Sequence, residues 1–270
     1  MSTIKIALHG AGGRMGRALV MALGHVDDLE LVGATESPKS TMLGQDSGTL
    51  AGVGANGIII TEHLEEAFAA ADVIIEFTRP NGTMRLLDTL QKAPRKLVTG
   101  TTGLDPSQQA RLREYAQGQA VVQAANFSVG VNLAIRLTEL AARVLDADAD
   151  IEIVEAHHRD KVDAPSGTAL RLGRAAAEAT GRSLEGDAVY SRVGQTGVRP
   201  ARAIGFATVR GGDIVGDHTV LFAGEGEQVE IRHRATSRAN FASGALRAAR
   251  WVHACPQGLH DMPEVLGLNA

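Results

Sequence analysis

The sequence has little cysteine, few aromatic side chains and no long apolar run. Its single cysteine, Cys255, cannot form a disulfide within the chain, which is typical of a reducing cytosol. No apolar run is long enough to span a bilayer and no charged-then-apolar leader opens the chain, so we expect a cytoplasmic protein without a membrane partner. Aromatic residues make up only 3% of the chain, and the net charge is −4 with both signs interspersed. This composition argues against a nucleic-acid partner.

Aliphatic side chains and glycine are abundant instead. Hydrophobic residues make up 44% of the 270 positions, which is enough for ordinary cores, and the length allows two domains. The 31 glycines favour aliphatic sheet packing with many tight turns.

The N-terminal segment has the pattern of a dinucleotide-binding unit. An apolar run at 4–8 predicts a strand, the turn 10–16 is rich in glycine, and a second apolar run at 29–34 leads to Glu36. Such glycines let the backbone approach a pyrophosphate at the positive end of a helix, while the acid accepts from ribose hydroxyls. Gly10, Gly13 and Gly16 are spaced as GxxGxxG, so an ordinary tight turn remains the alternative. The flanking strands, helix and acid favour a nucleotide site.

Charged residues near this turn bear on the choice of cofactor. Arg14 and Arg17 begin the predicted helix, where cations oppose the helix dipole, and this placement indicates phosphate contact or a solvated surface. Glu36 would repel a 2′-phosphate, and Lys39 is the nearest cation that could offset it. The sequence does not decide whether the cofactor is NAD or NADP.

Strands and helices continue to alternate through the first half. We predict strands at 58–61, 73–77, 97–99 and 121–124, with helices at 64–71 and 81–91 and another that starts at Asp105 and Pro106. This rhythm predicts an α/β fold, a Rossmann-type doubly wound parallel sheet whose ligands gather at the carboxyl ends of the strands. Phe77-Thr78-Arg79-Pro80, Gly100-Thr101-Thr102-Gly103 and Asn126-Phe127 fall at such ends.

The pattern changes near 128–130, where we place a domain boundary. A helix with Leu133, Leu137, Leu140 and Val144 at helical spacing is followed by a strand at 151–156 and, after the polar stretch 181–200, by strand-like runs at 204–210, 218–223 and 228–233. We expect a second, α+β domain with an open mixed sheet, one face of which is free for substrate or a partner subunit. A last helix at 240–253 should pack back on the first domain. The predicted domains are 1–128 completed by 239–270, for the dinucleotide, and 129–238, for substrate and oligomerisation.

The stretch 155–168, EAHHRDKVDAPSGT, concentrates polar chemistry between a strand end and a helix start. His157 and His158 exchange protons near neutral pH, Lys161 is a cation, and Ser166-Gly167-Thr168 offers hydroxyls and N–H groups. This set suits a small anionic substrate that must be held and protonated. Three alternatives are weaker. Adjacent histidines on a strand point apart, which argues against a metal site, and no GxSxG elbow is present to make Ser166 a nucleophile. A merely solvated charged loop is disfavoured because loops between a strand end and a helix start are where sites lie. We therefore expect no metal.

Five motifs together resemble the dihydrodipicolinate reductase family. They are GAGGRMG at 10–16, FTRP at 77–80, GTTG at 100–103, AANFSVGVN at 124–132 and EAHHRDKVDAPSGTAL at 155–170. The resemblance implies a homotetramer built through the open sheet, with a Rossmann domain closed by the C-terminal helix. It also implies an oxidoreductase of diaminopimelate and lysine biosynthesis, which reduces the cyclic imine derived from 4-hydroxy-tetrahydrodipicolinate to tetrahydrodipicolinate with NADH or NADPH.

The resemblance also implies roles for individual residues. His157 matches the general acid and Lys161 the second catalytic residue. The substrate-binding matches are His158, Ser166, Gly167, Thr168 and Thr102. The cofactor-binding matches are Gly10, Ala11, Gly12, Gly13, Arg14, Met15, Gly16, Glu36, Phe77, Thr78, Gly100, Thr101, Thr102, Ala125, Asn126 and Phe127. Ser37 departs from members with an arginine after the acid, which weakens any expectation of an NADPH preference.

Two other functions fit the same scaffold. One is a non-catalytic sensor that binds NAD(P)H, and the other is a different imine or amino-acid dehydrogenase. If the chain is the reductase, its two domains should close over the substrate about a hinge near 128–130 and 238–239.

Overall fold

The computed structural model describes residues 3–146, 148–237 and 239–269. Position 238, where one predicted hinge and one domain limit fall, and the outer limits at 1 and 270 lie outside the described residues. By its contacts the chain divides into two compact units, Met1–Val129 with Arg238–Ala270, and Gly130–Ser237. The second unit is thus inserted into the first.

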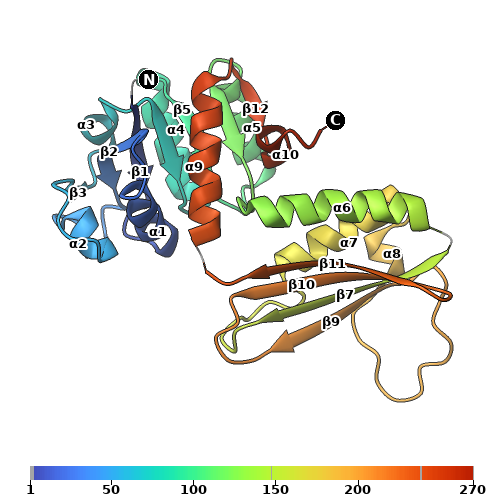
Figure 1. Ribbon diagram of the computed structural model, residues 1–270. Coiled ribbons are helices and arrows are strands. Elements are labelled where there is room, and N and C mark those ends of the chain that lie inside the picture. The colour runs from blue at the N-terminus through green and yellow to red at the C-terminus, as the bar shows by residue number, and fades with distance from the viewer. Residues whose placement is uncertain (1–2, 147, 238, 270) are drawn as a thin grey trace. The chain divides into compact units, whose positions relative to one another are not determined.

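The first unit contains the predicted parallel sheet, in the strand order β12-β6-β5-β4-β1-β2-β3. Every pair in this sheet is parallel, which confirms the doubly wound fold class (Figure 1). The strands are β1 Ile4–His9, β2 Leu29–Thr35, β3 Ile60–Thr61, β4 Val73–Glu76, β5 Lys96–Thr99, β6 Ala120–Gln123 and β12 Gly258–His260.

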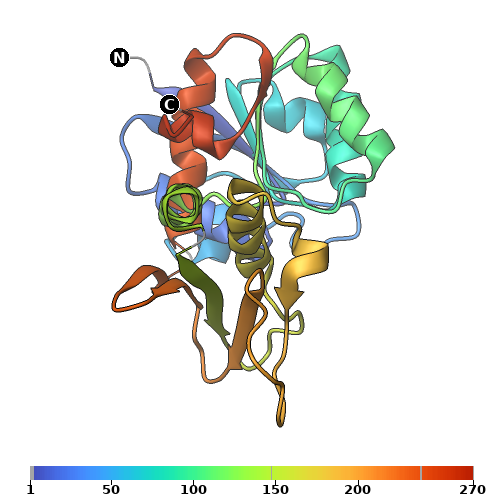
Figure 2. The same ribbon diagram turned by 90° about the vertical axis from the view of Figure 1, so that its right-hand side faces the viewer.

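Helices cover both faces of this sheet. They are α1 Arg14–Leu23, α2 Ser47–Ala51, α3 Leu64–Phe68, α4 Pro80–Lys92, α5 Pro106–Ala116, α9 Ala239–Ala254 and α10 Met262–Leu266. α1 and α9 pack with Ile6 and Leu8 of β1 in one apolar cluster, whereas α3, α4 and α5 pack with Ala7 in another. Figure 2 shows α9 and α5 on opposite sides of the sheet. Because alternate residues of a strand point to opposite faces, β1 is buried on both sides.

Local chemistry explains where these elements begin and end. Asp105 forms a capping box with Gln108 and Pro106 is the first residue of α5, so the predicted helix start is confirmed. The predicted strand at 58–61 is shorter than expected, because the carbonyl of Ile58 accepts from the N–H of Ser47 instead of joining the sheet. α2, which begins at Ser47, was not expected from the sequence.

The second unit contains a five-stranded sheet in the order β11-β10-β7-β9-β8. Its strands are β7 Ala149–His157, β8 Ala188–Val189, β9 Ile204–Arg210, β10 Gly216–Gly224 and β11 Gln228–Ala235. β10 runs antiparallel to β7 and β11, while β7 and β9 are parallel, so the predicted mixed sheet is confirmed. α6 Val129–Leu145, α7 Gly167–Ala179 and α8 Leu184–Asp187 lie on one face of it (Figure 1).

The face of α6 that is buried is not the apolar face that the sequence pattern predicted. The four apolar residues that predicted this helix are 42% to 70% exposed, and the buried side chains are smaller or polar ones. These are Val131, Asn132, Ala134, Thr138 and Ala142. Small side chains allow close approach to the rest of the unit, so the most apolar stripe of α6 faces outward. Among the described residues, no helix is long and apolar enough to cross a membrane.

Candidate active site

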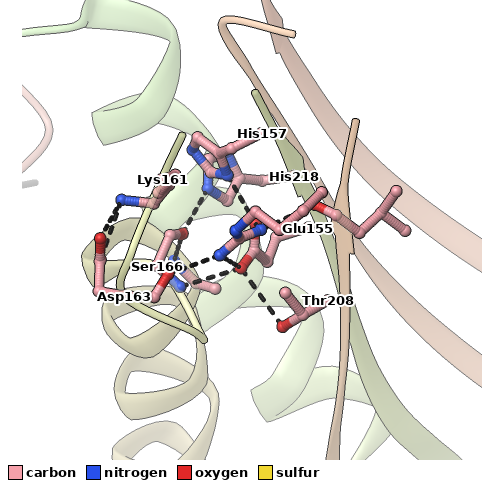
Figure 3. A network of polar contacts seen from close by, with 10 residues as sticks. Glu155, His157, Lys161, Asp163, Ser166, Thr208 and His218 are labelled. Atoms are coloured by element: carbon pink, nitrogen blue, oxygen red, sulfur yellow. Dashed lines mark hydrogen bonds and ion pairs between the residues drawn. The ribbon is translucent and has the colours of Figure 1, made fainter. Parts of the chain in front are cut away.

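Side chains of β7 point alternately to the two faces of the second sheet, and this alternation directs Glu155 and His157 into the interior of the second unit. Residues 151, 153, 155 and 157 point to the helix-covered face, and only 1% of Glu155 and 9% of His157 is exposed. Glu155 lies at the centre of the polar network in Figure 3. A buried carboxylate is costly unless donors surround it.

Five hydrogen bonds converge on the Glu155 carboxylate. Arg210 donates to both oxygens from its two terminal nitrogens, each at 2.8 Å. Oε1 also accepts from the backbone N–H of Ser166 at 3.1 Å and from Thr208 Oγ1 at 3.3 Å, and Oε2 lies 2.6 Å from His157 Nδ1. The register of β7 with β9 pairs Glu155 with Thr208 and His157 with Arg210, which explains why these side chains meet.

These contacts set the protonation of both groups. Burial opposes the charged form of Glu155, but the hydrogen bonds from Arg210 and His157 outweigh it and lower the pKa of the carboxyl below its usual range. Burial lowers the pKa of His157, as do the charges of Lys161 and Arg210, against the opposing effect of Glu155. The ionised Glu155 is an acceptor only, so His157 carries its proton on Nδ1 and Nε2 is the nitrogen left to exchange a proton. A side chain at Gly216 would place its Cβ 3.0 Å from this Nε2, so glycine keeps the space beside it open.

Ser166 is the N-cap of α7 and is held by a second histidine. Its Oγ accepts from the N–H of Ala169 at 3.2 Å and lies 2.9 Å from Nε2 of His218. The His218 ring stands edge-on to His157, with centroids 5.0 Å apart. Burial, with the nearby charge of His157, lowers the pKa of His218 to about 4, so His218 is neutral near pH 7. It therefore serves to hold Ser166 rather than to exchange protons.

Lys161 lies in the turn between β7 and α7 (Figure 3). Its Nζ donates to both oxygens of Asp163, at 2.7 and 2.9 Å, and this contact lowers the pKa of Asp163. The carbonyl of Asp163 in turn accepts from Arg210 at 2.6 Å, so the turn is tied to the buried network. The side chain of Lys161 is 20% exposed, so its ammonium can reach a ligand.

The structure brings most of the predicted catalytic and substrate residues together. His157, His158, Lys161, Ser166, Gly167 and Thr168 all lie around the turn from β7 to α7. Thr102 lies in the first unit, in the loop after β5, together with Gly100 and Thr101. Within the described ranges no group of three or more His, Cys, Asp or Glu side chains is arranged to hold a metal ion.

Four members of the network were given no role by the sequence, namely Glu155, Thr208, Arg210 and His218. Glu155 was within reach of sequence reasoning, because the strand period of two places it on the same face as His157. The other three come from β9 and β10, and only the sheet register brings them to this place.

In the first unit, the predicted cofactor residues line one edge of the parallel sheet. They follow the carboxyl ends of β1, β2, β4, β5 and β6, which are neighbours in the sheet. Gly10 has a φ of 86°, and a Cβ on Gly16 would lie 2.2 Å from the carbonyl oxygen of Gly10, so both positions require glycine. The Glu36 carboxylate accepts from the N–H groups of Gly12 and Ser37, each at 3.0 Å, and it retains acceptor capacity for ribose hydroxyls. This arrangement fits a dinucleotide.

Three of these loops also contact one another. A Cβ on Gly100 would lie 2.0 Å from the Phe77 ring, so the loop after β5 packs directly on the loop after β4. The Phe77 ring meets that of Phe127, from the loop after β6, with centroids 5.3 Å apart. The N–H of Thr78 donates to Oγ1 of Thr101 at 3.0 Å. These contacts hold the loops after β4, β5 and β6 in fixed positions relative to one another.

Comparison with known proteins is consistent across the whole chain. The family model described as dihydrodipicolinate reductase, N-terminus, matches residues 4–127, and the one described as dihydrodipicolinate reductase, C-terminus, matches residues 130–266. The chain is 53% identical over 267 residues to the 4-hydroxy-tetrahydrodipicolinate reductase of Thiobacillus denitrificans, covering 99% of the chain and 100% of the relative. It is also 53% identical over 269 residues to that of Nitrosospira multiformis, covering 100% of both.

Solved structures share the fold at lower identity. The dipicolinate-bound dihydrodipicolinate reductase from Paenisporosarcina sp. TG-14 has a TM-score of 0.75 and 24% identity, covering 97% of this chain and 98% of that one. GenD2 of gentamicin A biosynthesis, described in complex with NAD, has a TM-score of 0.54 and 16% identity, covering 100% of this chain and 88% of that one.

Proposed function

Because the chain belongs to the dihydrodipicolinate reductase family, we propose that it is a 4-hydroxy-tetrahydrodipicolinate reductase of diaminopimelate and lysine biosynthesis. It reduces the cyclic imine derived from 4-hydroxy-tetrahydrodipicolinate to tetrahydrodipicolinate. The single observation that carries this assignment is the Glu155–His157 pair beside the N-terminus of α7, in a chain that matches curated reductases along its full length.

A nicotinamide cofactor, when bound, supplies the hydride for this reduction. The glycine turn 10–16 and the N-terminus of α1 would hold its pyrophosphate, and Glu36 would accept from its ribose. The loops at 77–78, 100–102 and 125–127 would border the rest of the cofactor. Arg14 is exposed at the first position of α1, where it can pair with a phosphate.

The substrate carries two carboxylates, and the turn from β7 to α7 offers cations and N–H donors for them. The N–H groups at the start of α7, at Gly167 and Thr168, suit one carboxylate, and the ammonium of Lys161 suits the other or the ring nitrogen. To bind in this way, Lys161 exchanges its contact with Asp163 for one with the substrate. The Paenisporosarcina relative, whose structure contains dipicolinate, supports a pyridine dicarboxylate as a ligand of this fold.

His157 supplies the proton. Hydride addition to the conjugated ring builds negative charge, which an imidazolium beside the ring neutralises by donating from Nε2. In the free protein burial lowers the pKa of His157, whereas a bound dianion favours the charged ring. Glu155 holds Nδ1–H throughout and stabilises the imidazolium, so the proton leaves from the nitrogen that faces the ligand.

For the cofactor we propose a preference for NADH. The Glu36 carboxylate, which accepts from the N–H of Gly12, would also accept from the ribose 2′-hydroxyl and would repel a 2′-phosphate. Ser37 follows it and provides no guanidinium to offset that repulsion.

We also propose a cytoplasmic homotetramer. The face of the second sheet that the three helices leave uncovered carries apolar side chains, with Val154 40% and Val209 49% exposed. A second copy placed on this face would bury them. Light scattering in solution tests the assembly, and a monomeric mass would contradict it.

The reaction itself is tested by mixing the protein with NADH or NADPH and freshly generated dihydrodipicolinate, and following the loss of nicotinamide absorbance. In this assay H157Q should lower kcat by about 10²-fold, the usual scale of one general acid, with little change in cofactor affinity. H25Q, at an exposed histidine of the first unit, is the matched control. An unchanged kcat in H157Q would remove His157 from the role.

The alternative, a non-catalytic sensor of NAD(P)H, predicts cofactor binding without turnover. A thermal-shift titration with 2,6-pyridinedicarboxylate separates the two, because a sensor that binds only the cofactor gains no stability from the dicarboxylate. Turnover with another imine substrate alone would point to a different dehydrogenase.

A further inference from the structure

Glu76 is the last residue of β4, and its side chain is completely buried in the first unit. Its carboxylate accepts five hydrogen bonds, and all five donors belong to threonines. They are the N–H and hydroxyl of Thr78 and the hydroxyls of Thr83, Thr99 and Thr101. The preceding residues of β4 are apolar and equally buried, so Glu76 is the one charged residue of this strand.

The two carboxylate oxygens serve different parts of the unit. Oε2 accepts from Thr78 N at 3.1 Å, from Thr78 Oγ1 at 2.9 Å and from Thr101 Oγ1 at 2.8 Å. These donors lie in the loops after β4 and β5. Oε1 accepts from Thr83 in α4, at 2.9 Å, and from Thr99 in β5. One carboxylate therefore links two loops on one side and the supporting elements on the other.

The contacts also decide what the loops can offer a ligand. A threonine hydroxyl has one proton, and Thr101 gives its proton to Glu76 while its oxygen accepts from Thr78 N at 3.0 Å. The hydroxyl of Thr101 is thus occupied within the protein. The loops present their backbone groups to a ligand, in positions that the buried carboxylate fixes.

We propose that Glu76 is a positioning residue that holds the loops 77–79 and 100–103 in the geometry that binds the nicotinamide cofactor. Because its side chain is fully buried, it acts on a ligand through Thr78 and Thr101. Losing it would relax both loops at once, because each is tied to the same oxygen. This inference rests on the proposed use of these loops by the cofactor.

Two threonines provide a matched test. T101V and T83V each delete one hydroxyl that donates to Glu76 at nearly the same distance, but only Thr101 belongs to a cofactor loop. Both should lower the melting temperature in circular dichroism. T101V should raise the Kd for NADH about tenfold in a fluorescence titration, the order of one hydrogen bond to a charged group, and T83V should leave it within about twofold. T101S, which restores the hydroxyl, should restore the affinity.

E76Q tests the carboxylate directly. An amide keeps the size of the side chain but removes its charge and one acceptor oxygen, so whichever way it turns it cannot accept from all five donors and holds the remaining ones more weakly. The Kd for NADH should rise about tenfold, and T101V should add little in the E76Q background, because both act through the same contact. A purely structural role would lower the melting temperature without this coupling.

The outcomes separate cleanly. Three results would each overturn the role of Glu76 while the wild type still binds NADH. The first is an unchanged NADH affinity in folded E76Q and T101V, and the second is an equal weakening in T83V and T101V. The third is full additivity of E76Q with T101V. If E76Q does not fold, the comparison of T101V with T83V decides alone. If the wild type binds neither NADH nor NADPH, the proposed function fails, and this inference fails with it.

Discussion

Glu155 acts on His157 by fixing which nitrogen carries the proton. Its two oxygens are held by the forked guanidinium of Arg210, and one of them also faces Nδ1 of the histidine at 2.6 Å. A side chain that is itself rigid can fix the ring orientation of its neighbour, and a mobile carboxylate could not. The chemistry assigned to His157 thus depends on a residue two positions earlier in the same strand.

E155Q tests this dependence. The amide cannot accept from Arg210 on both sides and from His157 as well, so we expect kcat to fall about 10- to 100-fold. The inflection of the kcat/KM profile that reports His157 should move to lower pH, because the carboxylate raises the pKa of the ring. Steady-state rates over a pH series measure both effects.

E178Q, at an exposed position of α7, is the matched control and should change neither quantity. A normal rate and an unshifted profile in E155Q would show that His157 does not need its carboxylate partner.

Ser37 offers a test of cofactor choice at one exposed position. S37R places a guanidinium next to Glu36, where it can pair with a 2′-phosphate. We expect the KM for NADPH to fall several-fold relative to that for NADH, with kcat nearly unchanged. Side-by-side KM values for the two cofactors measure the shift, and an unchanged ratio would contradict the proposed role of this loop.

At the scale of elements, the sequence predicted the strands and helices better than the faces they bury. Alternation of apolar runs with glycine turns located β1, β2, β4, β5 and β6, because buried parallel strands are continuously apolar. The buried side of α6 could not be predicted, since small residues such as Ala134 and Ala142 fill close contacts that depend on the neighbouring elements. The polar network around Glu155 was hidden for the same reason, because Arg210 and His218 arrive through the register of β9 and β10.

The contact of α9 with the loop after β6 gives a prediction at this scale. A Cβ at Gly244 would lie 1.8 Å from the carbonyl oxygen of Phe127, a backbone atom that cannot move aside cheaply. G244A should therefore destabilise the protein by about 1–3 kcal/mol, although alanine normally favours a helix over glycine by up to about 1 kcal/mol. Urea unfolding measures the change.

S243A, at the exposed neighbouring position of the same helix, is the control and should leave the free energy of unfolding nearly unchanged or slightly higher. If G244A proved as stable as S243A, the close packing of α9 on this loop would be wrong.

For the whole molecule, several buried or half-buried histidines make the free energy of unfolding depend on pH. Burial is the largest cause that lowers the pKa of His9, His157, His218 and His233 below the ordinary value of 6.5. The unfolded chain therefore binds more protons than the folded one below about pH 6.5, and stability must fall as the pH falls. For His218, whose pKa is lowered to about 4, the difference corresponds to roughly 3 kcal/mol once the pH has fallen below both values.

Urea unfolding at about pH 7.5 and about pH 5 should therefore show a clear loss of the free energy of unfolding on the acid side. H218N should reduce that loss, because asparagine does not titrate. A free energy of unfolding that stays constant or rises toward pH 5 would contradict the lowered pKa values of these histidines.

The insertion of the second unit between the two segments of the first has a consequence for biosynthesis. α9 and β12 complete the apolar core and the edge of the first sheet, yet they follow the whole second unit in the chain and are translated after it. A nascent chain that has left the ribosome as far as Ser237 holds all of the second unit but leaves the face of the first sheet that α9 covers open to water. The second unit can therefore fold during translation before the segment that completes the dinucleotide-binding unit has left the ribosome.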